Sequence, residues 1–168
     1  MLLRAATPRD ALGVARVHVR SWQLAYRGLL PDDYLDQLTP ANRARGYSFG
    51  ARGAGHPATI LALEGEEILG FVTTGPSQDP QNPGAGEVMA LYVDPDHWGS
   101  GSGRALIAAG RERLCAIGFT AAILWVLDGN TNAERFYDAD GWTRDGSRRI
   151  DRPWGSAVHE LRYRRLLA

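Results

Sequence analysis

The fold of this chain is constrained most by one stretch of sequence. In it, an apolar run is followed by three closely spaced glycines and then by an amphipathic segment. Residues 88–93 are apolar without alternation, which is typical of a central strand covered on both faces. Gly99, Gly101 and Gly103 follow, and residues 103–117 have the periodicity of an amphipathic helix. A buried strand, a glycine loop and a helix in this order predict an α/β fold.

The rest of the chain alternates strand and helix patterns without a repeat or linker. We expect a single domain over residues 1–168, with a mixed sheet that has helices on both faces. Residues 75–86 contain three prolines and predict a long flexible loop, placed to act as a lid. The other predicted strands are residues 2–6, 58–64, 67–74, 121–127 and two within 142–166. A helix start at Thr7 leads into a predicted helix over residues 12–26, and the remaining predicted helices cover residues 31–38, 40–48 and 131–139.

The glycine loop predicts an anion site. Glycines at alternate positions let several backbone N–H groups converge, and a helix N-terminus adds unpaired N–H groups and partial positive charge. Arg104 adds a full charge beside them, so the loop suits a pyrophosphate. The alternative is a turn without a ligand. A nucleotide-hydrolase loop is excluded because the chain has no lysine, and the spacing differs from that of a dinucleotide-binding loop.

Composition narrows the possible partners. The formal net charge is zero, which argues against a general affinity for nucleic acid or an anionic membrane. No apolar stretch reaches the roughly 20 residues that span a bilayer, and no signal peptide is visible, so we expect a cytoplasmic location. The four histidines lack metal-ligand spacing, and we expect no metal. Cys115, the single cysteine, is expected to be a small buried apolar residue.

Two motifs in order give the chain a family resemblance. Residues 94–106 resemble motif A of the GNAT acetyltransferases, whose core falls on residues 98–103. Residues 130–142 resemble the family's Asn-x-x-Ala-x-x-x-Tyr-x-x-x-Gly-Phe pattern, and residues 18–31 and the tail 160–165 resemble a common subgroup. The chain departs from the family at Trp98, which replaces the usual Gln or Arg, and at two serines of the loop that are not basic.

The resemblance implies a fold and a co-substrate. It implies a mostly antiparallel sheet of about seven strands, in which residues 88–93 and 121–127 part to form a slot for acetyl-CoA. Strand 88–93 would hold the pantetheine arm through its backbone, and the glycine loop would hold the pyrophosphate. The coenzyme-binding residues implied are Leu91, Tyr92, Val93, Trp98, Gly99, Ser100, Gly101, Ser102, Gly103, Arg104, Asn130 and Tyr137.

Acetyl transfer to an amine suggests specific catalytic groups. An alkyl ammonium has a pKa of roughly 10, so a base or a water relay must deprotonate it at neutral pH. Glu87 is the candidate base, acting directly or through a water; the alternative is a solvated carboxylate at a strand end. Tyr137, matched to the family position, is the candidate acid for the departing sulfur; the alternative is a core aromatic. The N–H of Leu91 is a candidate to polarise the carbonyl.

The acceptor is expected to be a small-molecule primary amine. Its pocket should involve the first helices, the 75–86 loop and the final hairpin, where Trp22, Tyr26 and Trp154 lie, although the first two also fit a helix core face. The identity of the amine stays open. The rival interpretations are a non-catalytic acyl-CoA sensor or interaction module, and a protein N-terminal or longer-chain acyltransferase. Family members often form homodimers, and the sequence leaves that question open.

Overall fold

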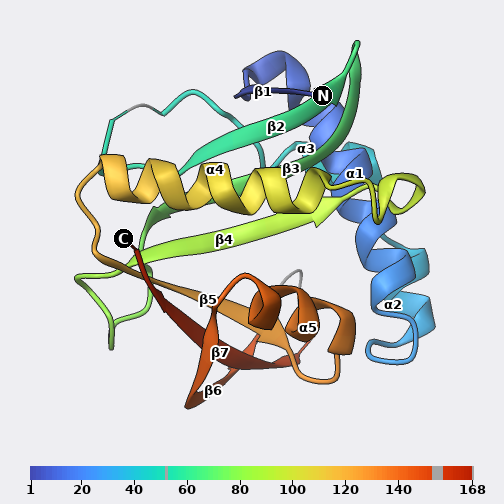
Figure 1. The fold of residues 1–168 in the computed structure, drawn as a ribbon. Coiled ribbons are helices and arrows are strands. Elements are labelled where there is room, and N and C mark those ends of the chain that lie inside the picture. Colours follow the sequence, from blue (N-terminus) through green and yellow to red (C-terminus); the bar gives the residue numbers. More distant parts are fainter. Residues whose placement is uncertain (52, 153–156, 168) are drawn as a thin grey trace.

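The chain forms one seven-stranded sheet with helices on both faces (Figure 1). The computed structural model describes residues 1–51, 53–152 and 157–167. Strand order is β1-β2-β3-β4-β5-β7-β6, and all neighbours are antiparallel except β4 and β5, so the predicted mixed, mostly antiparallel sheet is confirmed. The strands are β1 (Leu2–Ala5), β2 (Ala58–Glu64), β3 (Glu67–Pro76), β4 (Gly86–Val93), β5 (Ala121–Leu127), β6 (Thr143–Asp151) and β7 (Val158–Leu166).

Helices cover the two faces of the sheet separately. In Figure 1, α4 crosses β2, β3 and β4 on one face and α5 lies over β5 and β7. The long α1 packs on β3 and β4 from the other side. The predicted helices at residues 31–38 and 40–48 form, but each is only five residues long. The helices are α1 (Ala11–Ala25), α2 (Asp32–Asp36), α3 (Pro40–Ala44), α4 (Ser102–Ala116) and α5 (Thr131–Ala139), with 3₁₀ turns at Pro8–Asp10 and Pro95–His97.

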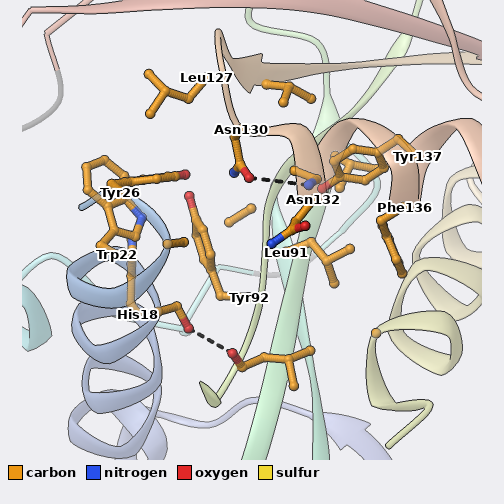
Figure 2. Close-up of a pocket in the computed structure, with 18 of the residues that line it drawn as sticks. His18, Trp22, Tyr26, Leu91, Tyr92, Leu127, Asn130, Asn132, Phe136 and Tyr137 are labelled. Atoms are coloured by element: carbon orange, nitrogen blue, oxygen red, sulfur yellow. Dashed lines mark hydrogen bonds between the residues drawn. The ribbon is translucent and has the colours of Figure 1, made fainter. Parts of the chain in front are cut away.

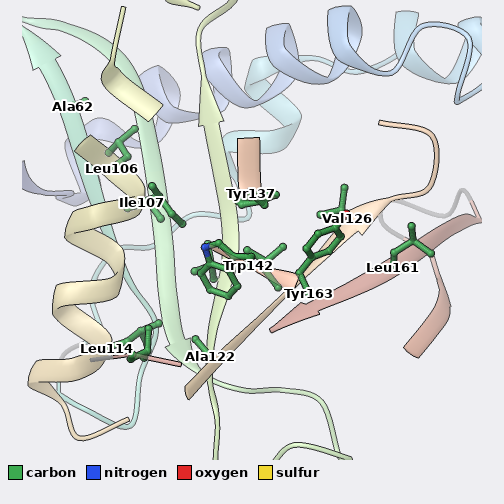
Figure 3. Packing of buried hydrophobic residues seen from close by; sticks show 14 of the residues in the cluster. Ala62, Leu106, Ile107, Leu114, Ala122, Val126, Tyr137, Trp142, Leu161 and Tyr163 are labelled. Atoms are coloured by element: carbon green, nitrogen blue, oxygen red, sulfur yellow. The ribbon is translucent and has the colours of Figure 1, made fainter. Parts of the chain in front are cut away.

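The main core lies beneath α4 and α5 (Figure 3). Leu106 and Leu114 of α4 are fully buried, and Trp142 just after α5 is 1% exposed. Cys115 was expected in this core and is instead exposed, so that prediction is wrong. Each helical residue turns about 100° from the one before, because a turn holds 3.6 residues. The residue after Leu114 therefore points away from the sheet.

The two halves of the sheet are joined at its centre by a short stretch of pairing between β4 and β5, which we call the seam. Strands β4 and β5 pair in parallel only at Gly86–Ala122, Glu87–Ile123 and Val88–Leu124. The β3–β4 register shifts just there, so that Met89 is an extra residue on β4, as in a β-bulge. A bulge bends its strand. Beyond Val88 the two strands part, as the resemblance implied.

Residues 77–85 form a shorter loop than expected. Both flanking strands extend into the predicted loop region, to Pro76 and from Gly86. The N–H of Ser77 donates to the carbonyl of Ala85 at 2.9 Å, which closes the loop on itself. A buried ion pair then fastens the loop to β7, between Asp79 and Arg162 at 2.7 Å. The loop therefore lies against β7 at the paired end of the seam, and its action as a lid stays a prediction.

Candidate active site

A cavity of about 890 Å³ opens where β4 and β5 part. Its walls come from α1, β4, β5, the glycine loop, α5 and the β6–β7 hairpin. Figure 2 shows Trp22 and Tyr26 from α1 on one side of this cavity and Asn130 and Tyr137 on the other. Residues 77–85 are not among the described residues that line it, so the expectation that this loop shapes the acceptor pocket is wrong.

Backbone groups of β4 face the cavity at alternate positions. The N–H of Asp94 donates to Leu69 of β3 at 2.7 Å. Since an antiparallel strand alternates the side to which its N–H and C=O groups point, those of Leu91 and Val93 face away from β3 and into the gap. The carbonyl of Val93 already accepts from Ser21 Oγ at 2.9 Å and from Trp98 Nε1 at 2.8 Å. The N–H groups of Leu91 and Val93 therefore face the space that a pantetheine arm would occupy.

The glycine loop is built as an anion cradle. Gly99 and Gly101 have φ of 80° and 90°, a left-handed conformation that favours glycine, and Gly101 caps α4. The first α4 backbone bond runs from Ala105 N to Gly101 O at 3.1 Å, so the amides of Gly103 and Arg104 precede it. Gly99, Gly101, Gly103 and Arg104 all line the cavity. Converging amides at a helix N-terminus suit a diphosphate.

Three predicted coenzyme residues have other local tasks. Ser100 and Ser102 bond to each other, Oγ to Oγ at 2.7 Å, and Ser102 is 1% exposed. Neither serine lines the cavity. Trp98 does line it, but its indole N–H is bonded to β4 and its ring is exposed at the mouth. The loop therefore offers main-chain amides and Arg104, rather than serine hydroxyls, to an anion.

Helix α5 brings the two motif residues to the opposite wall. The side-chain oxygen of Asn130 accepts from Ala133 N at 3.3 Å and so caps α5 (Figure 2). No hydrogen bond of its side-chain NH₂ group is seen within residues 1–51, 53–152 and 157–167. Tyr137 lines the cavity and also belongs to the main core. Burial raises the pKa of Tyr137 far above its usual value, so the phenol stays protonated.

Glu87 lies at the paired end of the seam and lines the cavity. It is 6% exposed, so the alternative of a solvated strand-end carboxylate is wrong. Its Oε2 accepts from the N–H of Gln78 at 2.9 Å. Burial raises the pKa of Glu87, and the Gln78 bond and the Arg149 guanidinium oppose that shift. A buried carboxylate with a raised pKa is suited to accept a proton near neutral pH.

Predicted and unpredicted residues form an aromatic wall of the cavity. Trp22 and Tyr26 line the cavity and are also buried in a core cluster, so the core interpretation is confirmed and their contact with an acceptor stays a prediction. Trp154 lies outside the described residues. Sequence reasoning missed Trp125, whose indole N–H is buried without a partner among the described residues, and Arg149, whose guanidinium lies 4.2 Å above that ring. The uniformly apolar run 121–127 gave no sign that its last three residues, Trp125 to Leu127, reach the cavity.

Comparison with known proteins decides the family. The sequence profile described as "Acetyltransferase (GNAT) family" matches residues 19–142. The chain belongs to the GNAT acetyltransferases. The uncharacterized N-acetyltransferase YuaI of Bacillus subtilis (strain 168) is 32% identical over 138 residues, covering 82% of this chain and 77% of that protein. A mycothiol acetyltransferase of Geodermatophilus obscurus is 35% identical over 100 residues, which are 58% of this chain but only 32% of that protein.

Solved structures agree with this GNAT fold. YncA of Salmonella typhimurium, a putative acetyltransferase with its cofactor acetyl-CoA, has a TM-score of 0.73 at 17% identity, covering 100% of this chain and 94% of that one. The PaiA N-acetyltransferase of Thermoplasma acidophilum in complex with coenzyme A has a TM-score of 0.68 at 15% identity, covering 98% of both chains. Among the described helices of this GNAT chain, none is long and apolar enough to cross a membrane.

The residues present fit acetyl-CoA. A Cβ built on Gly99 or Gly101 meets no atom within 4 Å, so the loop surface stands open, and the left-handed backbone keeps side chains from it. A Cβ on Gly103 would lie 3.3 Å from Phe136, which shows how closely α4 approaches α5 there. The gap beside Leu91 and Val93 continues from this loop to Glu87 within one cavity. A long molecule with a diphosphate and an amide-bearing arm matches that shape and chemistry.

Proposed function

We propose that this GNAT protein is an N-acetyltransferase that moves the acetyl group of acetyl-CoA onto a primary amine of a small molecule. Transfer is by direct attack within a ternary complex. The observation that carries this proposal is the single cavity that joins the glycine loop to Glu87 and the aromatic wall. Because the coenzyme and the acceptor have separate ends of one space, both are bound when the amine attacks.

In this proposal the coenzyme lies along β4. The amides of Gly101, Gly103 and Arg104 and the Arg104 side chain hold its diphosphate. The N–H groups of Leu91 and Val93 and the side-chain amide of Asn130 orient its arm. When bound, acetyl-CoA supplies an activated acyl group on a thiol leaving group. Val93 contributes its N–H alone, since its carbonyl is bonded to Ser21 and Trp98.

Three groups of the chain then divide the chemistry. Glu87 takes a proton from the acceptor ammonium, directly or through a water, and leaves a neutral amine. The N–H of Leu91 donates to the carbonyl oxygen as negative charge develops there. The Tyr137 hydroxyl donates a proton to the departing sulfur and regains one from the amine nitrogen, which loses its second proton as the amide forms. The relatives that are named mycothiol acetyltransferases support a small-molecule acceptor. Which amine is the acceptor is the first question that an assay must answer.

Thiol release from acetyl-CoA across an amine panel tests the proposal. Tyr137→Phe should lower turnover by about 10²–10⁴-fold, the usual contribution of general acid catalysis. Coenzyme affinity should stay near that of the parent protein. Tyr163→Phe is the matched control, because Tyr163 shares the same core but its hydroxyl accepts from Arg144 Nε at 3.0 Å. That control should keep full turnover.

The panel also separates the rival functions. Coenzyme binding without thiol release for any amine would favour an acyl-CoA sensor. Release that requires a peptide N-terminus or a longer acyl donor would favour the corresponding acyltransferase. Unchanged turnover in Tyr137→Phe would remove this hydroxyl from the chemistry and leave the sulfur to be protonated by water.

A further inference from the structure

The loop of residues 77–85 touches the candidate base through its backbone. The N–H of Gln78 donates to Oε2 of Glu87 at 2.9 Å. Gln78 itself is exposed, whereas Glu87 is buried, so the contact is made by the main chain and not by the Gln78 side chain. A main-chain donor can be aimed at a carboxylate only if the loop that carries it is held still.

A buried ion pair holds this loop. Asp79 and Arg162 meet at 2.7 Å, and their side chains are 8% and 11% exposed. Asp79 also accepts from the N–H of Gln81 at 2.9 Å, so its carboxylate organises the loop and fastens it to β7 at once. Buried pairs of this kind add little net stability, because desolvation offsets the attraction, but they tolerate little change in geometry.

We propose that the Asp79–Arg162 ion pair locks the loop so that the Gln78 amide stays on Glu87, which makes Asp79 and Arg162 positioning residues for the base. This inference rests on the proposed function, in which Glu87 deprotonates the acceptor. Neither residue lines the cavity, so they act on the reaction only through the loop and its charge.

The charges around Glu87 set the sign of the expected effect. Burial raises its pKa most, and the Asp79 carboxylate raises it further. The Gln78 amide, the Arg149 guanidinium from β6 and the Ser77 hydroxyl lower it. Removing the Gln78 N–H therefore raises the pKa of Glu87, because the charged form loses a donor. The base then stays protonated, and inactive, up to a higher pH.

Two substitutions at one position isolate the amide. Gln78→Pro removes the N–H, while Gln78→Ala keeps it and removes only the exposed side chain. The acid limb of the pH profile of kcat/KM should move up by about one unit in Gln78→Pro, since hydrogen bonds commonly shift a carboxyl pKa on that scale. It should stay in place in Gln78→Ala. A shared acid limb in the two variants would overturn the inference.

Hydrogen exchange of the Gln78 amide, followed by NMR, tests the lock without any turnover. Asp79→Asn should speed this exchange at least about tenfold, because the loop is released. Asp145→Asn is the control: Asp145 also pairs with Arg162, at 2.6 Å, but from β6. Its exchange rate should match the parent protein. Equal protection in Asp79→Asn and Asp145→Asn would show that the pair does not hold the loop.

The two proposals fail in different ways. An acid limb that survives in Glu87→Gln would remove Glu87 as the base, and the exchange experiment would still decide the lock. An acid limb that disappears in Glu87→Gln but does not move in Gln78→Pro would keep the base and reject its tuning by the loop.

Discussion

At the scale of single residues, burial raises the pKa of a carboxylate that lines the cavity. Glu87 has the backbone of the loop as its donor and Arg149 as a nearby cation, yet burial outweighs both and its pKa is raised. The same effect keeps the Tyr137 phenol protonated. A buried carboxylate with a raised pKa and a protonated phenol thus line the same cavity.

Glu87→Gln tests the base at this scale. The parent protein should show an acid limb in kcat/KM centred above 4.5, the ordinary value for this carboxyl, because burial raises its pKa and only the ionised form accepts a proton. The substitution should lower kcat/KM by about 10²–10⁴-fold and abolish that limb. Full activity with an intact limb would assign proton removal to water or to another group.

At the scale of elements, periodicity and glycines were sufficient to predict the strands and helices. The run 88–93 and the spacing of the glycines located β4 and α4, since each pattern has a direct physical cause. Side-chain direction was harder to predict. The 3.6-residue period could have placed Cys115 outward next to the buried Leu114, but nothing in the sequence showed that Ser100 and Ser102 bond to each other instead of facing a ligand.

The turn that begins α4 is expected to be needed for coenzyme binding. Gly101→Ala places a Cβ at φ of 90°, which costs about 1–2 kcal/mol for a non-glycine residue. The turn should shift, and KM for acetyl-CoA should rise about tenfold, since about 1.4 kcal/mol is a factor of ten. Gly55→Ala is the control, because a Cβ there also meets nothing within 4 Å and Gly55 lies before β2, outside the cavity lining. Equal KM values would separate the turn from coenzyme binding.

At the scale of the whole molecule, two half-sheets meet at three residue pairs. Strands β1 to β4 form one half, and β5, β7 and β6 form the other. The family resemblance implied this parting, whereas the long-range contacts around it were beyond sequence reasoning. Arg149 on Trp125 and Asp79 on Arg162 join segments that no local pattern relates.

Coenzyme binding should therefore stabilise the whole chain. At 100 times its Kd, acetyl-CoA adds about 2.7 kcal/mol, which for a chain of this size raises Tm by about 5–10 °C in a thermal shift assay. ADP at the same concentration carries the diphosphate without the arm and should give a much smaller shift. Equal shifts would mean that the arm makes no contact between the half-sheets.

The pairing of β4 with β5 up to Val88 and Leu124 has a consequence for the length of acyl group that the protein is expected to accept. The gap between β4 and β5 narrows toward the residues where the two strands pair. In the proposed binding mode, an acyl group that enters from the wide end can go no further than that pairing. In that mode, we expect a longer acyl group to meet the paired backbones of β4 and β5. Donor length is thus limited by backbone pairing, so point changes of side chains should relax it less readily than lengthening the bulge at Met89.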